Sequence, residues 1–266
     1  MSGCINKWHY HSAGDPASLP VLLLHGFMGS GRVWLPTMNQ LAGQIFAIAP
    51  DLPGHGQTEA DLGELDFDTL SSDLLDLCNL QFDRPPVLVG YSLGGRMALY
   101  SALKYPDRFS ALVLESSSAG IEVESERRQR LDQDMQTADR LRITDMVSFL
   151  TEWYKQPLFA SLSRETVAGI IQKKSGGNRH HFAEAVVRLS PGRQPSLWNR
   201  LPEWTKPILI LSGARDTKYS QIAQRMAEYM PQAQLEIIPD AGHIVHLENN
   251  QAFFAALKSF LSTCIL

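Results

Sequence analysis

The sequence is poor in cysteine, has no long apolar run and carries slightly less positive than negative charge. Three cysteines, Cys4, Cys78 and Cys264, are too few and too widely spaced for a disulfide framework or a metal-binding motif. No apolar run approaches the roughly 20 residues that cross a membrane, and the N-terminus has no secretory signal pattern. We therefore expect a cytoplasmic protein with free thiols, no membrane insertion and no bound metal.

The charge balance argues against a second class of partner. The chain has 24 Lys and Arg against 28 Asp and Glu, a formal net charge of −4. Because nucleic-acid binders usually present a basic surface, we expect no nucleic-acid partner. With 266 residues, 44% of them hydrophobic, the chain suits one large domain or a domain with an insertion. A monomer and a weak homo-oligomer both stay open.

Short apolar runs that end near Gly or Pro recur along the chain. Apolar runs without alternation are typical of parallel strands that are covered on both faces. Helical stretches such as 68–80 and 96–104 separate them, and this alternation predicts a mostly parallel, doubly wound α/β sheet. The predicted strands are 21–24, 45–49, 87–89, 112–114, 208–211 and, more weakly, 235–238.

The stretch 121–202 interrupts this alternation. It has no clear buried-strand run, and helical patterns rich in Arg, Gln, Glu and Asp dominate its first part. A segment of about 80 residues is much longer than the usual connection between neighbouring strands. We therefore predict a helical cap over 121–202, inserted into a core formed by 1–120 and 203–266.

One motif indicates a nucleophile. Gly90-Tyr91-Ser92-Leu93-Gly94-Gly95 fits G-x-S-x-G, and it lies between the predicted strand 87–89 and the helical stretch 96–104. That context is typical of a nucleophile elbow, in which a sharp turn exposes the serine. The N-terminus of the following helix favours negative charge near Ser92. Ser92 is therefore the predicted nucleophile.

A nucleophilic serine needs a base and a residue that orients the base, in the chain order Ser, acid, His for this fold. Asp216 follows the predicted strand 208–211, and His243 follows the predicted strand 235–238. Both lie at strand carboxyl ends, where open α/β sheets assemble their sites. Asp240 is a rival acid that precedes the histidine. The rival bases, which lack this combination of place and order, are His25, His55 and His246.

Two backbone N–H groups are expected to form an oxyanion hole. Phe27 follows the first predicted parallel strand, and Leu93 directly follows the nucleophile. His25 is expected to brace the loop that carries Phe27. The loop 51–56 is assigned no chemistry.

These residues resemble the α/β-hydrolase superfamily over nearly the whole chain. Other segments narrow the resemblance: Arg96 directly after the elbow, Arg127-Arg128-Gln129-Arg130, and Ala241-Gly242-His243-Ile244-Val245-His246. The most specific is Trp153-Tyr154-Lys155-Gln156-Pro157-Leu158-Phe159-Ala160-Ser161-Leu162. Together they are similar to the family of 2-succinyl-6-hydroxy-2,4-cyclohexadiene-1-carboxylate (SHCHC) synthases of menaquinone biosynthesis.

The resemblance implies a lyase that eliminates pyruvate from 2-succinyl-5-enolpyruvyl-6-hydroxy-3-cyclohexene-1-carboxylate, a small polycarboxylate, with no cofactor or metal. Ser92 would remove a ring proton, His243 would activate Ser92, and Asp216 would orient His243. Lys174 stands where the family often has Arg, with Lys173 as the alternative. The other implied substrate-binding residues are Tyr91, Arg96, Arg128, Trp153 and Tyr154.

Two other classes stay open. The same catalytic residues suit a serine hydrolase of an acidic small molecule, either a carboxylesterase or a hydrolase of carbon–carbon bonds. A non-catalytic ligand-binding module is the third class, against which the intact Ser92, Asp216 and His243 argue. A dehalogenase is disfavoured because the elbow holds Ser rather than Asp. A menaquinone and a phylloquinone pathway are not distinguished.

Overall fold

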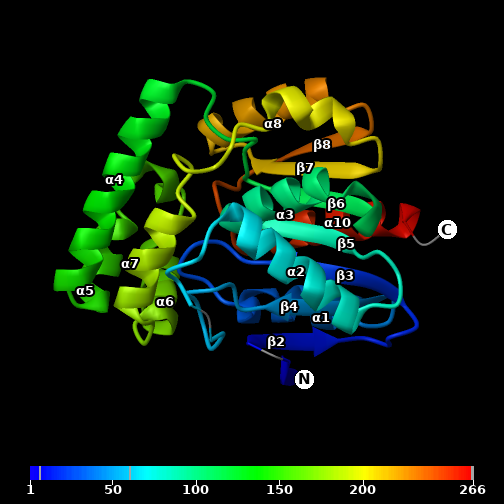
Figure 1. Ribbon diagram of the computed structural model, residues 1–266, viewed down its shortest axis with the longest axis horizontal. Helices are drawn as coiled ribbons and strands as arrows, with labels where there is room; N and C mark the ends of the chain where they lie inside the picture. The colour runs from blue at the N-terminus through cyan, green and yellow to red at the C-terminus, as the bar shows by residue number, and fades with distance from the viewer. Residues whose placement is uncertain (6, 60, 265–266) are drawn as a thin grey trace.

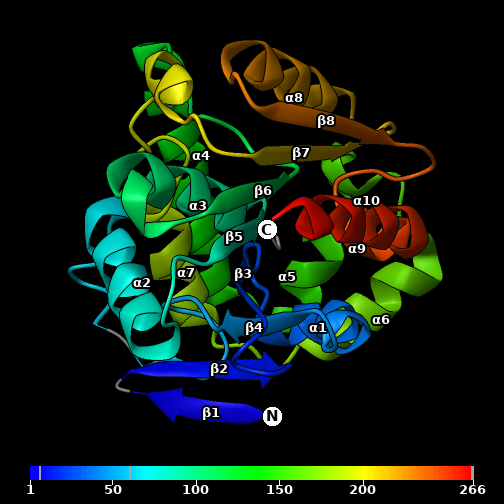
Figure 2. The same ribbon diagram turned by 90° about the vertical axis from the view of Figure 1, so that its right-hand side faces the viewer.

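The computed structural model describes residues 1–5, 7–59 and 61–264. Within these residues an eight-stranded sheet runs through the molecule in the order β1-β2-β4-β3-β5-β6-β7-β8 (Figures 1 and 2). Strands β3 to β8 are parallel, and β1 and β2 are antiparallel additions at one edge. The strands are β1 Ser2–Ile5, β2 Trp8–Ala13, β3 Leu19–Leu24, β4 Ile45–Pro50, β5 Val87–Tyr91, β6 Ala111–Glu115, β7 Ile208–Gly213 and β8 Ala233–Ile238.

The strands predicted from apolar runs are confirmed as β3 to β8. The central ones are buried along their whole length, which explains why their sequences do not alternate. Strand β8 lies at an edge and alternates between exposed and half-buried residues, so its apolar run is weak. Strands β1 and β2 were not predicted, because an edge hairpin of half-exposed polar residues lacks a buried-strand pattern.

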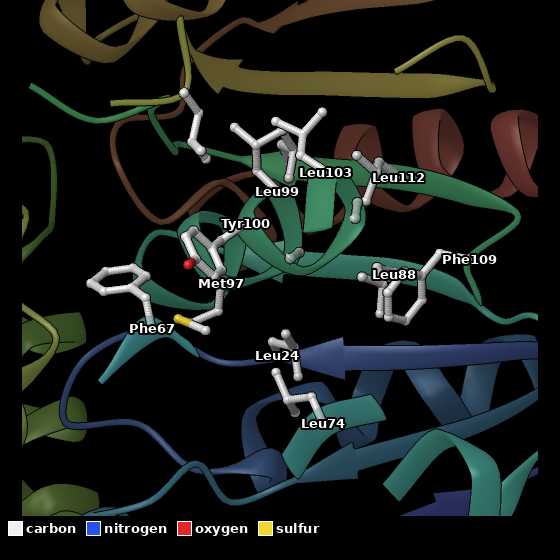
Figure 3. Close-up of a cluster of buried hydrophobic side chains, with 14 of the residues drawn as sticks. Leu24, Phe67, Leu74, Leu88, Met97, Leu99, Tyr100, Leu103, Phe109 and Leu112 are labelled. Atoms are coloured by element: carbon white, nitrogen blue, oxygen red, sulfur yellow. The ribbon is translucent and has the colours of Figure 1, made fainter. Parts of the chain in front are cut away.

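Helices cover both faces of the sheet (Figure 2). Alternate strand residues supply two separate cores, one packed against α2, α3 and α8 and the other against α1 and α10. Figure 3 shows part of the first core, where Leu24 of β3, Leu74 of α2 and Met97 of α3 lie close together. The helices are α1 Leu35–Leu41, α2 Phe67–Gln81, α3 Leu93–Lys104, α8 Thr217–Tyr229, α9 Val245–Glu248 and α10 Asn250–Thr263, with 3-10 turns η1 Gly31–Trp34, η2 Pro106–Arg108 and η4 Trp198–Glu203.

The chain between β6 and β7 forms a group of helices beside the sheet, on the left in Figure 1. A third apolar cluster joins these helices to the core, because it includes Met28 from the loop after β3 and Ile244 from the loop after β8. Helix α7, rich in charge and histidine, was not predicted. The elements are α4 Glu124–Ile143, α5 Met146–Trp153, η3 Pro157–Phe159, α6 Arg164–Lys174 and α7 Arg179–Arg188.

The α/β class and the mostly parallel, doubly wound sheet are therefore confirmed. Among the helices of the described ranges, none has both the length and the hydropathy that a membrane crossing needs.

The approach of α3 to β3 can be tested by adding one methyl group. A Cβ at Gly94 would lie 2.2 Å from the Leu24 carbonyl oxygen, and neither backbone can give way. We expect Gly94→Ala to lower the free energy of unfolding by about 2 kcal/mol or more in urea titrations. Gly43→Ala is the matched control, because a Cβ there meets nothing within 4 Å. Equal midpoints for the two variants would contradict this packing.

Candidate active site

Ser92 occupies a strained turn between β5 and α3. Its φ of 51° and ψ of −108° lie outside the regions that L-residues favour, and it is the residue that caps α3. The Ser92 N–H donates to the carbonyl oxygen of Glu115 on the neighbouring strand, at 2.9 Å. A Cβ at Gly90 would lie 2.4 Å from the Gly94 carbonyl oxygen, so the turn requires glycine there. This geometry is that of a nucleophile elbow.

The structure brings Ser92, His243 and Asp216 into one hydrogen-bonded chain. His243 Nε2 lies 3.2 Å from Ser92 Oγ, and His243 Nδ1 lies 2.7 Å from Asp216 Oδ2. The Nδ1–H donates to the carboxylate, which leaves Nε2 free to accept the serine proton. Asp216 also caps α8 by accepting the Tyr219 N–H at 3.1 Å. Both His243 and Asp216 are buried, so water does not compete for these bonds.

The rival acid and one rival base have other partners. Asp240 is exposed and pairs with Arg215 at 2.7 Å. His246 Nδ1 lies 2.9 Å from the buried carboxylate of Glu115. Neither residue forms a hydrogen bond with Ser92 or His243 in the described part of the chain.

Two backbone N–H groups are available for an oxyanion. Leu93 is the first residue of α3, where N–H groups have no partner within the helix. Phe27 lies in the loop after β3, and across the ranges 1–5, 7–59 and 61–264 neither N–H donates a hydrogen bond. His25 holds this loop in place, because its Nε2 accepts the Leu52 N–H at 2.9 Å and its Nδ1–H donates to the Gly26 carbonyl at 2.8 Å.

Burial keeps two histidines near this loop uncharged. The His55 ring packs 5.1 Å from the His25 ring and 5.3 Å from Phe182 of α7, measured between centroids. Desolvation lowers the pKa of His25 to about 4 and that of His55 to about 3. Both rings are therefore neutral at pH 7 and act as structural groups rather than as bases.

Arg96 is a buried cation that has no carboxylate partner among residues 1–5, 7–59 and 61–264. Its guanidinium donates to Gln194 Oε1 at 3.2 Å and to the Leu189 carbonyl at 2.9 Å, and it lies over the Phe67 ring. Burial lowers its pKa to about 10, with a smaller contribution from the charge of Arg130, so it stays charged at pH 7. A buried charge without a counter-ion is costly, which suits a site that receives an anion.

The arginines of α4 point in different directions. The Arg128 side chain is 76% exposed and pairs with Glu124 at 3.1 Å. Residues two apart lie about 200° apart around a helix, so Arg130 occupies the opposite side. There it pairs with buried Asp134 at 3.0 Å, and its charge opposes the rise that burial causes in the pKa of Tyr219. Arg128 therefore lies on the exposed side of α4, whereas Arg130 lies on the side of Asp134 and Tyr219.

Of the other expected binding residues, Tyr91 packs beside His243, and the rest have partners elsewhere in the described residues. The ring of Tyr91 is 5.5 Å from that of His243, and the ring of Trp153 is 5.7 Å from that of Phe27. Tyr154 is buried, and Lys174 Nζ donates to its hydroxyl at 2.9 Å. Lys173 is exposed, so of the two lysines it is Lys174 that faces Tyr154.

Three neighbours of the His243 segment were not singled out from the sequence. The ring of Tyr219 is 4.6 Å from that of His243, and the ring of Phe159 is 6.2 Å from it. Ser161 packs so closely on Gly242 that a Cβ there would lie 2.0 Å from Ser161 Oγ. Phe159 and Ser161 belong to the 153–162 string, which was the available signal; Tyr219 had none.

One group of side chains has the composition of a metal site. Donor atoms of His9, His11 and Asp51 lie within 4.8 Å of one another at the β2 edge. The Asp51 carboxylate already accepts the Gly31 N–H at 2.7 Å, the Gln57 N–H at 2.8 Å and His9 Nδ1 at 2.8 Å. These bonds explain the group as a brace for the loop after β4.

Cavity volume does not locate the site. A cavity of about 440 Å³ lies between the loop before α2 and the segment after α7, with Asp66, Arg127 and Arg193 among its lining residues. Neither Ser92 nor His243 lines it. The hydrogen-bonded chain, rather than the cavity, identifies the candidate active site.

An elbow serine with a buried His–Asp pair, on a doubly wound sheet, defines a class of enzymes. The chain matches the alpha/beta hydrolase fold family over residues 20–250. It therefore belongs to the α/β-hydrolase family and is an enzyme.

Individual relatives show to which group within this family the chain belongs. A Serratia proteamaculans SHCHC synthase is 33% identical over 242 residues, which cover 91% of this chain and 92% of that protein. The structure of MenH from S. aureus superposes with a TM-score of 0.92 and 32% identity, covering 98% of this chain and 99% of that one. An esterase from Thermogutta terrifontis, in a malate-bound structure, gives 0.85 and 27%, covering 97% and 94%. Within the superfamily the chain belongs with the SHCHC synthases.

The two buried histidines make stability depend on pH. In the folded chain their pKa values are near 4 and 3, whereas an unfolded histidine titrates near 6.5. The unfolded chain therefore binds more protons below pH 6.5, and stability, complete above that pH, falls towards pH 4. We expect His55→Gln to reduce the slope of unfolding free energy against pH by about 1 kcal/mol per unit between pH 4.5 and 6. If unfolding free energies from urea titrations, plotted against pH, run parallel for wild type and variant, this expectation is contradicted.

Proposed function

We propose that this enzyme is an SHCHC synthase, which eliminates pyruvate from 2-succinyl-5-enolpyruvyl-6-hydroxy-3-cyclohexene-1-carboxylate in menaquinone or phylloquinone biosynthesis. The Serratia proteamaculans relative that carries this name supports it over 92% of that protein's length. The observation that favours it most within the chain is buried Arg96, a cation without a carboxylate partner in the described residues. A polycarboxylate substrate supplies the missing negative charge.

In this reaction Ser92 acts as a base. His243 accepts the proton of Ser92 Oγ through Nε2, while Asp216 orients the ring and stabilises its positive charge. The serine oxygen then removes a ring proton. The electron pair of that C–H bond is first held as an enolate on the succinyl carbonyl oxygen. When the enolate collapses, this pair forms a new carbon–carbon double bond in the ring, the existing ring double bond shifts by one position, and the carbon–oxygen bond to the enolpyruvyl group breaks. Pyruvate leaves as its enolate and is then protonated on carbon.

The N–H groups of Phe27 and Leu93 stabilise the charge that develops when the proton leaves. The succinyl carbonyl oxygen becomes an oxyanion, which suits the Leu93 N–H at the start of α3 and the Phe27 N–H in the loop after β3. No water molecule enters the reaction, and no acyl group is transferred to Ser92.

Fixed cations and aromatic rings hold the substrate. Arg96 lies on α3, which packs against the sheet. Arg130 and Lys174 belong to the segment 121–202, which we regard as a cap over the site. Trp153 and Tyr154 belong to the same segment. Because Arg pairs bidentately with a carboxylate and Lys does not, we assign the two arginines the larger share of carboxylate binding.

A serine hydrolase of an acidic small molecule is the second candidate. The esterase from Thermogutta terrifontis, with 27% identity, favours it. In that reaction Ser92 would attack a carbonyl carbon, and water would release the acyl group. The products separate the two candidates, because only the lyase releases pyruvate without incorporating water.

Removing the serine oxygen tests the base. We expect Ser92→Ala to lower kcat for pyruvate release by about 10³ or more, because in the described part of the chain no other oxygen forms a hydrogen bond with His243 Nε2. Thermal unfolding should be nearly unchanged, since the hydroxyl is not part of the core. Release of pyruvate at a rate near that of the wild type would refute the assigned role of Ser92.

Three arginine variants test which cations bind the substrate. We expect Arg96→Ala and Arg130→Ala to lower kcat/KM for pyruvate release by a factor of about 10 to 1,000. Arg128→Ala should stay within a factor of about 2, because its side chain is exposed on the other side of α4. A large loss in Arg128→Ala with an unchanged Arg130→Ala would restore the sequence-based expectation. Circular dichroism melts should accompany each measurement, because Arg96 is buried.

A further inference from the structure

His243 lies on a loop rather than in a strand or helix. The loop connects the edge strand β8 to the short helix α9, so regular backbone pairing does not hold the residue. Its side chain must nevertheless keep Nε2 3.2 Å from Ser92 Oγ and Nδ1 2.7 Å from Asp216. Some other contact has to fix the backbone at this position.

Glu248 makes that contact on both sides of the histidine. Its Oε2 accepts the Gly242 N–H at 2.9 Å, and its Oε1 accepts the Ile244 N–H at 2.9 Å. One carboxylate therefore binds the N–H groups of both residues that flank His243. These bonds restrain the backbone from which the His243 side chain projects, because a shift of the 242–244 segment would break a charge-assisted hydrogen bond.

A second carboxylate fixes the segment farther along. Glu115 accepts the backbone N–H of His246 at 3.0 Å and also bonds its ring Nδ1 at 2.9 Å. Glu115 is fully buried at the end of β6, and its own carbonyl oxygen accepts the Ser92 N–H at 2.9 Å. Glu115 thus bonds both the segment that follows His243 and the backbone of Ser92. The local orientation of His243 itself is left to Glu248.

We propose that Glu248 is a positioning residue that holds His243 in register with Ser92; this role rests on the proposed function of His243. The carboxylate is required because an amide offers only one acceptor oxygen, and its NH₂ group would face an N–H donor. A misplacement of about 1 Å at a catalytic group can reduce a rate by about 10²-fold.

The test uses a probe that depends on the triad and not on the lyase substrate. An alkyl fluorophosphonate phosphonylates an activated serine, with loss of fluoride, and its inactivation kinetics give KI and kinact separately. We expect Glu248→Gln to lower kinact about 10- to 100-fold with KI changed less than about 3-fold. Glu248→Asp keeps the charge but is one methylene shorter, so it should recover part of the loss.

Two further variants give reference values of kinact. Glu236→Gln makes the same charge change at an exposed position of β8 and should leave kinact within a factor of about 2. His243→Ala gives the rate without a base. Thermal melts identify any variant that does not fold, and if Glu248→Gln does not, the comparison of Glu248→Asp with wild type decides.

Each outcome has one meaning. A wild-type kinact in Glu248→Gln, or a change confined to KI, overturns the positioning role. If Glu248→Gln does not fold, a folded Glu248→Asp with the wild-type kinact also overturns the positioning role. A wild-type enzyme that reacts no faster than His243→Ala overturns it together with the triad. A normal wild-type kinact, a low one in Glu248→Gln and no pyruvate from the enolpyruvyl substrate would remove the lyase function but support the positioning role.

Discussion

The candidate site depends on how closely α3 approaches the sheet where β5 ends. Gly94 lies against the Leu24 carbonyl, and a Cβ at Gly90 would meet the backbone of the first turn of α3. Only because these side chains are absent can the chain turn sharply enough to hold Ser92 at φ 51°. The same turn places the Leu93 N–H at the start of α3, so one turn positions both the candidate nucleophile and one candidate oxyanion donor.

Around this turn the site is assembled from distant parts of the chain by carboxylates that accept N–H groups. Asp216 bonds His243, Glu115 bonds His246, and Asp51 holds the loop that His25 also braces. All three carboxylates are buried, so each hydrogen bond is protected from water. The chain between β6 and β7 carries Arg130, Lys174, Trp153 and Tyr154, which we propose bind the substrate beside these bonds.

The sequence allowed much of this to be predicted, but unevenly. Strands β3 to β8 were predictable because burial on both faces leaves an apolar run that the chain itself displays. Strands β1 and β2 were not, since half-exposed polar edges carry no such run. Ser92, Asp216 and His243 could be chosen by motif and order, whereas Arg128 and Arg130, two residues apart, could not be told apart without the helix orientation.

The sequence alone determined the fold class, the elbow and the order of acid and base, because each is encoded in neighbouring residues or in the succession of strands. Only the tertiary structure decided that Arg130 rather than Arg128 lies on the buried side of α4, that Arg96 has no carboxylate partner among the described residues, and that Glu248 binds the N–H groups of both neighbours of His243. The physical reason is that a local sequence pattern identifies a residue and the helix, strand or loop that contains it. The direction of a side chain, and what it contacts, depend on how separate elements pack.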